Sequence, residues 1–257
     1  MTSLAQTVKR FSASAVTALA LTLPAAALDL GAMTADEQAE FGEQVRAFLL
    51  ENPQVILEAI DILEQRNAVA EAERDKSLVQ HNLAALVDDG YSWVGGNPEG
   101  DITVVEFMDY RCGFCRRAKP EVEQLLAQDG NIRLIIKELP ILGESSVVAS
   151  RFAIAAKHIE GPEAYKTIHD ALMEMPGEPN EIILSRLSDS FGFDTAKILE
   201  GMNTEAVTSE LRRTRQLASN MSIGGTPTFI LGDELVRGYL PFDQMKTMIQ
   251  EQRAENG

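Results

Sequence analysis

Both cysteines of this chain, Cys112 and Cys115, stand three positions apart at the end of an apolar run. They follow residues 102–107, which are typical of a buried strand, and they precede residues 121–126, which are typical of a helix. The pair is therefore predicted to lie at a strand-to-helix junction, with Cys112 near the N-terminus of the helix. The unpaired N–H groups and the dipole at that position favour a thiolate.

Three kinds of site use paired cysteines, and the sequence discriminates among them. A disulfide that closes so short a loop stabilises a fold by only about 2 kcal/mol, which a chain of this length does not need. A structural zinc site needs four ligands, and His81, His158 and His169 are remote from the pair. A two-thiolate clip for Cu(I) stays open. A redox couple is favoured, with no cofactor and no resident metal.

Positive side chains surround the cysteines. Arg111, Arg116, Arg117 and Lys119 all fall within or beside the first helical turns. Cations near a helix N-terminus are repelled by the helix dipole and destabilise the helix. Their presence at this position therefore indicates a function. We expect the cluster to help hold a thiolate on Cys112.

The N-terminus predicts export. Lys9-Arg10 is followed by an uncharged apolar stretch that ends in Ala25-Ala26-Ala27, the pattern of a cleaved signal peptide over residues 1–27. The stretch is short for a membrane span, which needs about 20 residues. The net charge of −16 becomes 21 − 39 = −18 without these residues. Such acidity argues against nucleic acid and anionic lipid as partners.

A helical arm is predicted for residues 28–89. Thr34 to Glu37 is a capping-box pattern, and Asn52-Pro53 is typical of the start of a second, longer helix. Apolar residues recur along both segments at helical spacing. The arm either packs on its own domain or associates with other copies of the chain, and we favour the second, a homo-oligomer.

The remainder, residues 90–257, has an α/β order. Strand, helix and strand precede a helical block at about 144–222, and strand, strand and helix follow it. The helix after the cysteines is expected to break at Pro120.

Together, EFMDYRCGFC, the proline-containing helix, the helical block and GGTPTFI resemble the DsbA family of thioredoxin-fold proteins. The stretch AFLLENPQVILEAI further resembles the ScsC branch, the suppressor-of-copper-sensitivity proteins. The resemblance implies a thioredoxin-like α/β fold with an inserted helical domain. It also implies a protein thiol–disulfide oxidoreductase of the periplasm, which acts on extracytoplasmic proteins that contain cysteines.

Residue roles follow from the same resemblance. Cys112 is expected to attack, Cys115 to resolve the mixed disulfide, and Glu106 to accept a proton from a buried strand position. The expected substrate contacts are Gly113, Phe114, Thr226 and Pro227, with Pro227 after a cis peptide bond.

One departure from the family pattern bears on whether the protein oxidises or reduces its substrates. Strongly oxidising members carry a histidine between the cysteines, where this chain has Gly113-Phe114. A less oxidising couple is therefore expected, and isomerisation or general exchange is favoured. A dedicated oxidase and a Cu(I)-binding copper-tolerance protein are the alternatives. A membrane or periplasmic redox partner is expected to reset the couple.

Overall fold

The computed structural model describes residues 33–256, which divide into two compact units, residues 33–62 and 63–256. The predicted signal peptide at 1–27 lies outside the described residues. The first unit holds helix α1 (Ala35–Glu51) and the beginning of α2 (Gln54–His81). Thr34 and Glu37 form the predicted capping box at the start of α1.

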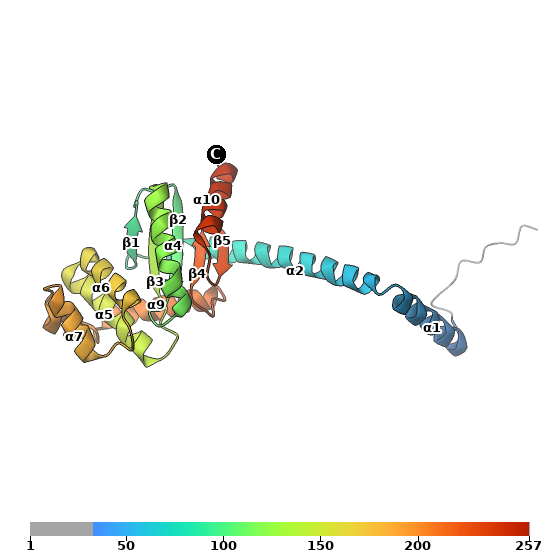
Figure 1. Cartoon of the computed structure of the whole chain (residues 1–257), viewed down its shortest axis with the longest axis horizontal. Coiled ribbons are helices and arrows are strands. Elements are labelled where there is room, and N and C mark those ends of the chain that lie inside the picture. Colours follow the sequence, from blue (N-terminus) through green and yellow to red (C-terminus); the bar gives the residue numbers. More distant parts are fainter. Residues whose placement is uncertain (1–32, 257) are drawn as a thin grey trace, which may run out of the picture. The chain divides into compact units, whose positions relative to one another are not determined.

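The second unit holds the rest of α2 and a mixed sheet with its helices (Figure 1). Its elements after α2 are, in chain order, α3 (Leu83–Val87), β1 (Trp93–Gly96), β2 (Ile102–Met108), α4 (Gly113–Asp129), β3 (Ile132–Glu138), α5 (Glu144–Glu160), α6 (Pro162–Glu174), α7 (Glu181–Ser190), α8 (Thr195–Gly201), α9 (Glu205–Asn220), β4 (Thr228–Leu231), β5 (Glu234–Arg237) and α10 (Phe242–Asn256).

The five strands of the sheet lie in the order β1-β3-β2-β4-β5. Strands β2 and β3 are parallel, and α4 makes the crossover between them. The other three pairs are antiparallel. Strand β2 is central and buried along its length, so the residues that follow it emerge from the middle of the sheet.

Alternation along β2 sends its side chains to two cores. Val104 and Met108 pack into the core beneath α4 and α10, which run alongside the strands (Figure 1). Val105 and Phe107 face the opposite core, which also contains Val79 of α2. Leu86 of α3 and Leu217 of α9 also belong to that second core. The end of the predicted arm is thus part of the interior of the second unit.

Helices α5 to α9 form the predicted insertion between β3 and β4. Figure 1 shows α5, α6 and α7 gathered beyond one end of the sheet. Helix α5 is the central member of this block, with a face of alanines and Phe152 fully buried. The expected α/β thioredoxin-like fold with a helical insertion is confirmed.

One local expectation needs correction, and one strand was missed. Helix α4 does not break at Pro120 but continues to Asp129. A proline removes only one backbone donor, and the buried face formed by Ala118, Val122 and Leu125 keeps the helix on the sheet. The edge strand β1 was not predicted, because four residues that include Gly95 and Gly96 give a weak strand signal.

Candidate active site

Cys112 is the N-cap of α4, and Cys115 lies in the first turn of that helix. Both are free thiols. The backbone N–H of Cys115 donates to the Sγ atom of Cys112 at 3.4 Å. Cys112 retains a small exposed area, whereas Cys115 is fully buried. The two thiols therefore differ in access, and a reagent in solution can reach only the first of them.

The loop before β4 faces Cys112. The Thr226–Pro227 peptide bond is cis, as the resemblance implies. The thiol of Cys112 donates to the carbonyl oxygen of Thr226 at 3.1 Å. The carbonyl of Pro227 accepts from the N–H of Gly238, which fixes this loop against the end of β5. Two segments that are more than a hundred residues apart in the chain thus meet at one sulfur atom.

The two thiols have opposite acidities. The hydrogen bond with the Cys115 thiol is the largest cause that lowers the pKa of Cys112, from 9.0 to about 5. Hydrogen bonding by the side chain of Thr226 and by the N–H groups of Cys115 and Phe114 acts in the same direction, against burial. The same thiol–thiol bond, then burial and the nearby Glu106, raise the pKa of Cys115. At neutral pH the pair holds a thiolate on Cys112 and a thiol on Cys115.

The positive side chains near the cysteines do not hold the thiolate, contrary to expectation. Arg111 binds the carbonyl of Gly177 and the carboxylate of Glu178. Arg116 binds the carbonyls of Tyr110 and Met175. Both guanidinium groups are therefore engaged in fixing the segment after α6. The low pKa of Cys112 is caused instead mainly by the Cys115 thiol and by N–H groups of the first helical turn.

Two more cations of that cluster are also engaged elsewhere. Arg117 stacks over the ring of Tyr239, with 4.4 Å from its Cζ atom to the ring centroid. Lys119 pairs with carboxylates on α4 and α6, namely Glu123, Asp170 and Glu174. Arg117 thus links α4 to the loop between β5 and α10, and Lys119 links α4 to α6, so both cations have a structural explanation.

Glu106 occupies the predicted inward position on β2, on the α4 side of the sheet. Its side chain is buried, and its Oε1 atom has no hydrogen-bond partner among the described residues. Burial is the largest cause that raises the pKa of Glu106 to about 8, followed by the charges of Cys112 and Glu138. Glu106 and both cysteines therefore form one electrostatically coupled group.

Glu106 also lines a cavity of about 80 Å³ between the sheet, α4 and α6. Lys119 and Glu123 of α4 and His169 and Asp170 of α6 contribute polar walls to it. A space of this size can hold water, whose share of the liquid is about 30 Å³ per molecule. The buried carboxylate thus shares this cavity with Lys119 and two of its carboxylate partners, Glu123 and Asp170.

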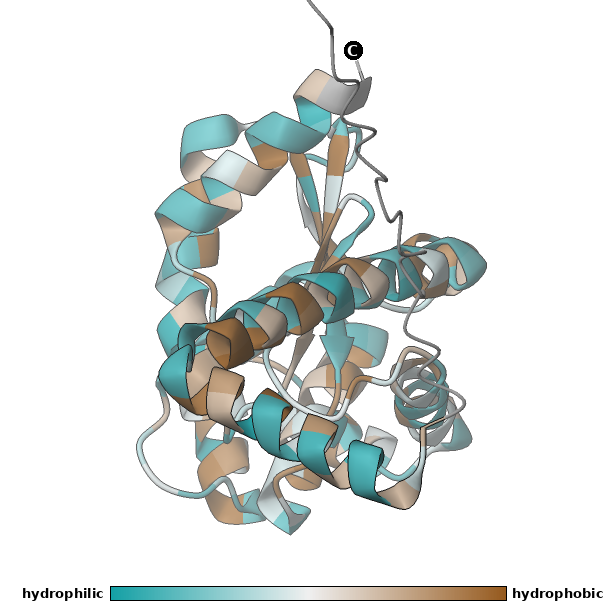
Figure 2. Cartoon of the chain, turned by 90° about the vertical axis from the view of Figure 1, so that its right-hand side faces the viewer, coloured by the Kyte–Doolittle hydropathy of each residue, from teal (hydrophilic) through white to brown (hydrophobic). Residues whose placement is uncertain are grey.

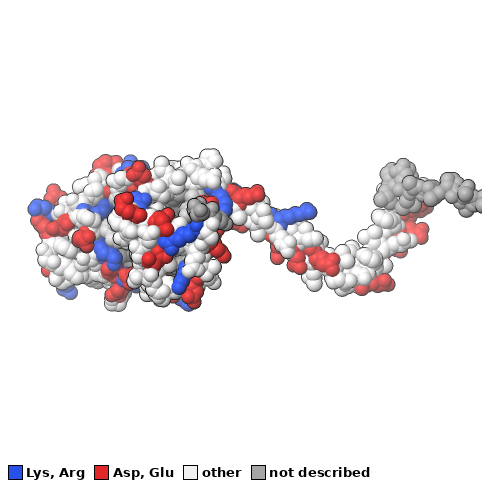
Figure 3. Space-filling view, turned by 90° about the horizontal axis from the view of Figure 1, so that it is seen from above, with Lys and Arg blue, Asp and Glu red and all other residues white. Residues whose placement is uncertain are grey.

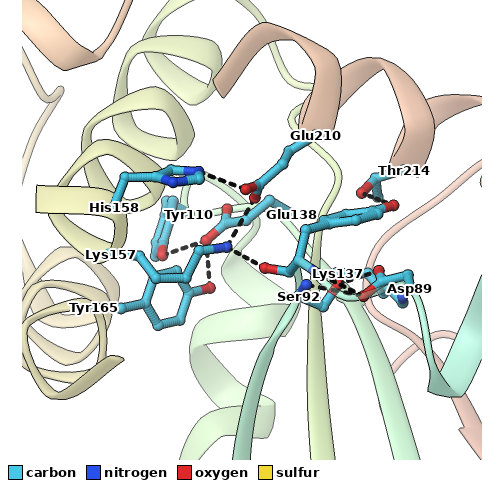
Figure 4. A network of polar contacts seen from close by, with 11 residues as sticks. Asp89, Ser92, Tyr110, Lys137, Glu138, Lys157, His158, Tyr165, Glu210 and Thr214 are labelled. Carbon is cyan, nitrogen blue, oxygen red and sulfur yellow. Dashed lines mark hydrogen bonds and ion pairs between the residues drawn. The ribbon is translucent and has the colours of Figure 1, made fainter. Parts of the chain in front are cut away.

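Sequence reasoning missed a buried carboxylate at the end of β3. Glu138 accepts hydrogen bonds from Tyr110 at 2.7 Å, Tyr165 at 2.6 Å and Ser150 at 2.7 Å. Burial raises its pKa to about 7 against those hydrogen bonds. Figure 4 shows the tyrosines pointing at this carboxylate, with Lys157 and Glu210 alongside. Because Tyr110 stands two residues before Cys112, this network fixes the approach to the redox pair. Only its position at a strand end could have indicated it.

Asp109 was also missed, although it directly follows β2. Its carboxylate accepts from the N–H groups of Arg111, Ile141 and Leu142 and from the hydroxyl of Ser146. It therefore joins the segment before Cys112 to the loop between β3 and α5. An Asp side chain often accepts from the backbone N–H two residues further on, as Asp109 does from Arg111, so an Asp directly after a strand is a recognisable signal of such a turn.

Exposed apolar side chains lie at this end of the molecule. Phe114, between the cysteines, is 60% exposed, and Leu142 is 51% exposed. Of the predicted site residues, the structure brings together Glu106, Cys112, Cys115, Thr226 and Pro227. Gly113 and Phe114 lie in the turn between the cysteines.

Among residues 33–256, no group of three or more His, Cys, Asp or Glu side chains is arranged to hold a metal ion. In the same range, no helix is long and apolar enough to cross a membrane. A thioredoxin-like sheet with a low-pKa cysteine at a helix N-terminus, beside a cis-proline loop, defines the class of thiol–disulfide oxidoreductases.

The family models agree. The model for the DSBA-like thioredoxin domain matches residues 103–250, more than half of the chain. The model for the copper resistance protein ScsC N-terminal domain matches residues 37–70. The chain belongs to the DSBA-like thioredoxin family, in its ScsC-like branch, and is a thiol–disulfide oxidoreductase.

Individual relatives cover most of this chain. A thioredoxin-like oxidoreductase from Silicibacter pomeroyi is 40% identical, with a TM-score of 0.62, over 66% of this chain and 97% of its own. Proteus mirabilis ScsC in a transitional conformation is 27% identical, with a TM-score of 0.63, over 87% and 100% respectively. Disulfide bond formation protein D of Bacillus subtilis is 24% identical over 169 residues, 61% of this chain and 75% of that protein.

Proposed function

We propose that this protein exchanges disulfides with polypeptide substrates in the periplasm, and that isomerisation and general exchange are favoured over one-way oxidation. Cys112 is the attacking residue, Cys115 the resolving residue, and Glu106 the proton acceptor. The observation that carries the proposal is the low-pKa thiol of Cys112, beside the Thr226 carbonyl and next to a fully buried partner thiol.

The first step is attack of the Cys112 thiolate on a substrate disulfide. A bond forms between Cys112 Sγ and one substrate sulfur, and the other substrate sulfur leaves as a thiolate. No net oxidation has occurred at this point. If a different substrate thiolate then attacks the mixed disulfide, the Cys112 thiolate is released and the substrate has been isomerised.

The second possible step is resolution by Cys115. Its thiol loses a proton, attacks Cys112 Sγ and expels the substrate thiolate, so the substrate is reduced by two electrons and the protein disulfide forms. Reversal of both steps oxidises a substrate. Glu106 is suited to take the proton because the thiolate charge on Cys112, one cause of its raised pKa, disappears in the mixed disulfide. Its carboxylate form becomes more favourable at that step.

Substrate is expected to bind along the cis-proline loop, at Thr226 and Pro227, and against Gly113 and Phe114. Pro227 has no N–H, and its carbonyl is already bonded to Gly238. The N–H of Thr226 makes no hydrogen bond to any described residue, and its carbonyl is freed when Cys112 ionises. One donor and one acceptor thus remain for an extended peptide, which suits binding of many sequences through the backbone.

The arm, residues 28–89, is proposed to assemble several copies into a homo-oligomer. Apolar side chains are exposed along its first helices, and Figure 2 shows them as brown positions that recur along α1 and α2. They are Phe41, Val45, Phe48, Leu50, Ile56, Leu57, Ile60, Ile62, Leu63 and Val69. Covering such a face by a second copy would bury it. Several active sites joined in this way raise the thiol concentration around one bound substrate, which favours isomerisation.

Export by a cleaved signal peptide at residues 1–27 remains part of the proposal, as does a membrane or periplasmic redox partner that resets the couple. A Cu(I)-binding role at the same two cysteines is the second candidate. It is favoured by the match to the copper resistance ScsC N-terminal domain. Loading the reduced protein with Cu(I), with and without Cys112, measures whether this pair binds the ion.

The assembly claim is tested with substitutions in the arm, since a deletion that extended past Ile62 would remove core residues such as Val79. The triple variant Val45→Asp, Phe48→Asp, Ile60→Asp should be monomeric by light scattering. It should reduce insulin normally and lose most isomerisation of scrambled RNase.

The matched control adds the same charges at polar positions, Gln38→Asp, Gln44→Asp, Gln54→Asp, and should behave as the parent protein. A full-length protein that is already monomeric would overturn the assembly claim, and the dedicated-oxidase alternative would then be preferred.

A further inference from the structure

A pocket of about 230 Å³ lies between α5, α9 and the loop after β3, and its walls are strongly basic. Arg151 of α5 and Arg212 and Arg215 of α9 line it, together with the hydroxyl of Thr208. No aspartate or glutamate contributes to its lining. Three arginines around one pocket are unexpected in a chain with 39 acidic and 23 basic residues. Figure 3 shows acidic and basic side chains intermixed over the visible face and mostly acidic ones along the arm.

Two of these guanidinium groups are held in place by neutral acceptors. Nη1 of Arg151 donates to the carbonyl of Met202 at 2.7 Å and to Oγ1 of Thr208 at 3.1 Å. Nη2 of Arg215 donates to the carbonyl of Pro140 at 3.1 Å. These bonds orient the groups but leave their charges without a carboxylate. Neither Nε nor Nη2 of Arg151 has a hydrogen-bond partner among the described residues.

The third arginine is only loosely paired. Arg212 lies 3.1 Å from Glu205, but the two side chains are 65% and 75% exposed. An ion pair so exposed contributes little and exchanges readily. The pocket therefore presents oriented N–H donors. A bound anion can accept hydrogen bonds from them without breaking a strong ion pair within the protein.

The shape and chemistry of the pocket select among anions. Arginine presents a planar fork of donors that matches a carboxylate in a bidentate fashion. Pro140 and Leu211 add apolar wall beside the guanidinium groups. A carboxylate on a short hydrocarbon chain fits this lining, because the carboxylate can bind the arginines and the hydrocarbon can contact Pro140 and Leu211.

The pocket is tied to the redox site by one loop. Pro140 precedes Ile141 and Leu142, whose N–H groups donate to Asp109, three residues before Cys112. We propose that this arginine pocket binds a carboxylate of the polypeptide substrate, from an acidic side chain or the C-terminus, while a nearby substrate cysteine reacts at Cys112. The inference rests on the proposed disulfide exchange and adds a sequence preference to it.

The test uses peptides that carry one cysteine as a methyl disulfide. In each pair, Glu replaces Gln at one position, and the position is varied on either side of the cysteine; a further pair compares a free C-terminus with an amide. The reduced full-length protein attacks the peptide disulfide, and the rate of loss of that disulfide is measured. For the best placement, the carboxylate peptide should react about tenfold faster than its neutral partner, as expected for one charge-assisted contact.

The net charge of the protein predicts the opposite preference, since it repels an acidic peptide. The variant Arg151→Gln, Arg215→Gln should lose the preference while keeping the rate for the neutral peptide. Arg212→Gln should weaken the preference without affecting folding, because its side chain is exposed. Arg186→Gln on α7, an exposed arginine outside the pocket, is the matched control and should change nothing.

The outcomes separate the two proposals. If neither peptide reacts, the proposed exchange activity is wrong. If both react equally at every placement, or if the preference survives in the arginine variants, the carboxylate pocket is wrong and these arginines are solvated surface groups.

Discussion

The backbone N–H of Cys115 points at the Sγ atom of Cys112 from 3.4 Å, and the thiol of the same residue stabilises that sulfur's charge. One residue thus supplies two donors to its neighbour. Because the donors lie in the first turn of α4, they come with the local fold and need no distant cation.

This relationship predicts the titration of Cys112. Alkylation of the reduced protein against pH should show a midpoint near pH 5. In the variant Cys115→Ala the N–H remains but the thiol donor is lost, so the midpoint should move upward. Arg117→Gln should leave it unchanged, because Arg117 stacks on Tyr239 and is not a cause of the shift. A midpoint that follows Arg117 and ignores Cys115 would restore the cationic explanation.

Stability should depend on pH in the reduced protein more than in the oxidised protein. The pKa of Cys112 is about 5 when folded and 9.0 in the reference state. A lowered folded pKa contributes stability that is present above the unfolded value and is lost as pH falls towards 5. The free energy of unfolding of the reduced form, relative to the oxidised form, should therefore rise between pH 5 and 9, by at most about 1.4 kcal/mol per pH unit. Urea unfolding of the reduced and oxidised forms measures this difference. The raised pKa of Glu106 has the opposite effect on stability, and the same measurement in the Glu106→Gln background removes it. Equal pH profiles for the two forms would contradict a stabilised thiolate.

Glu106→Gln should slow resolution but not attack. The first encounter of Cys112 with a disulfide should keep its rate, whereas release of substrate by Cys115 should slow by about a hundredfold, typical of a lost proton acceptor. Rapid-quench separation of the two steps measures this. Equal slowing of both steps would indicate that the substitution disturbs the fold.

The same substitution has a stability signature in the reduced form. The folded pKa of Glu106 is about 8 against 4.5. A raised pKa for an acid favours folding below its unfolded value, and that contribution is lost as pH rises through 8. Glu106→Gln should therefore stabilise the protein more at pH 9 than at pH 5, and a constant difference would contradict the raised pKa.

The interior ion pair between Lys137 and Asp89 predicts a large loss of stability. The Lys137 side chain is fully buried and pairs with Asp89 at 2.5 Å. Lys137→Ala leaves a largely buried carboxylate unpaired and should cost about 3–5 kcal/mol in urea unfolding. Adding Asp89→Ala should recover part of that loss.

Lys76 and Asp233 form the matched control, since both side chains are exposed by about two fifths. Lys76→Ala should cost less than about 1 kcal/mol. Similar costs at both lysines would show that burial does not decide the value of these pairs.

Short-range patterns predicted what depends on neighbouring residues. The position of Cys112 at a helix N-terminus follows from the strand before it and the helix after it. The side of the sheet on which Glu106 lies follows from the alternation along β2, its burial from the apolar run around it, and the capping box at Thr34 from residues three positions apart. Each of these features is determined within about one turn or one strand, so the sequence contains enough to predict it.

Long-range pairings were not predictable in this way. The partners of Arg111 and Arg116 lie in the segment after α6, about sixty residues away. Glu138 resembles an ordinary strand-end residue until α5 and α6 bring Ser150 and Tyr165 to it. The attribution of the low pKa of Cys112 to the nearby arginines was wrong, because residues that are close in sequence to Cys112 direct their charged groups to other parts of the fold.

The central claim is that Cys112 attacks the substrate and Cys115 resolves the mixed disulfide. The most direct measurement mixes the reduced Cys115→Ala variant with a disulfide-bonded protein such as insulin and maps covalent adducts by mass spectrometry. The account predicts a stable mixed disulfide at Cys112, and no adduct at the buried Cys115 when Cys112→Ala is treated in the same way. An adduct at Cys115 in that second variant, or none at Cys112 in the first, would contradict it.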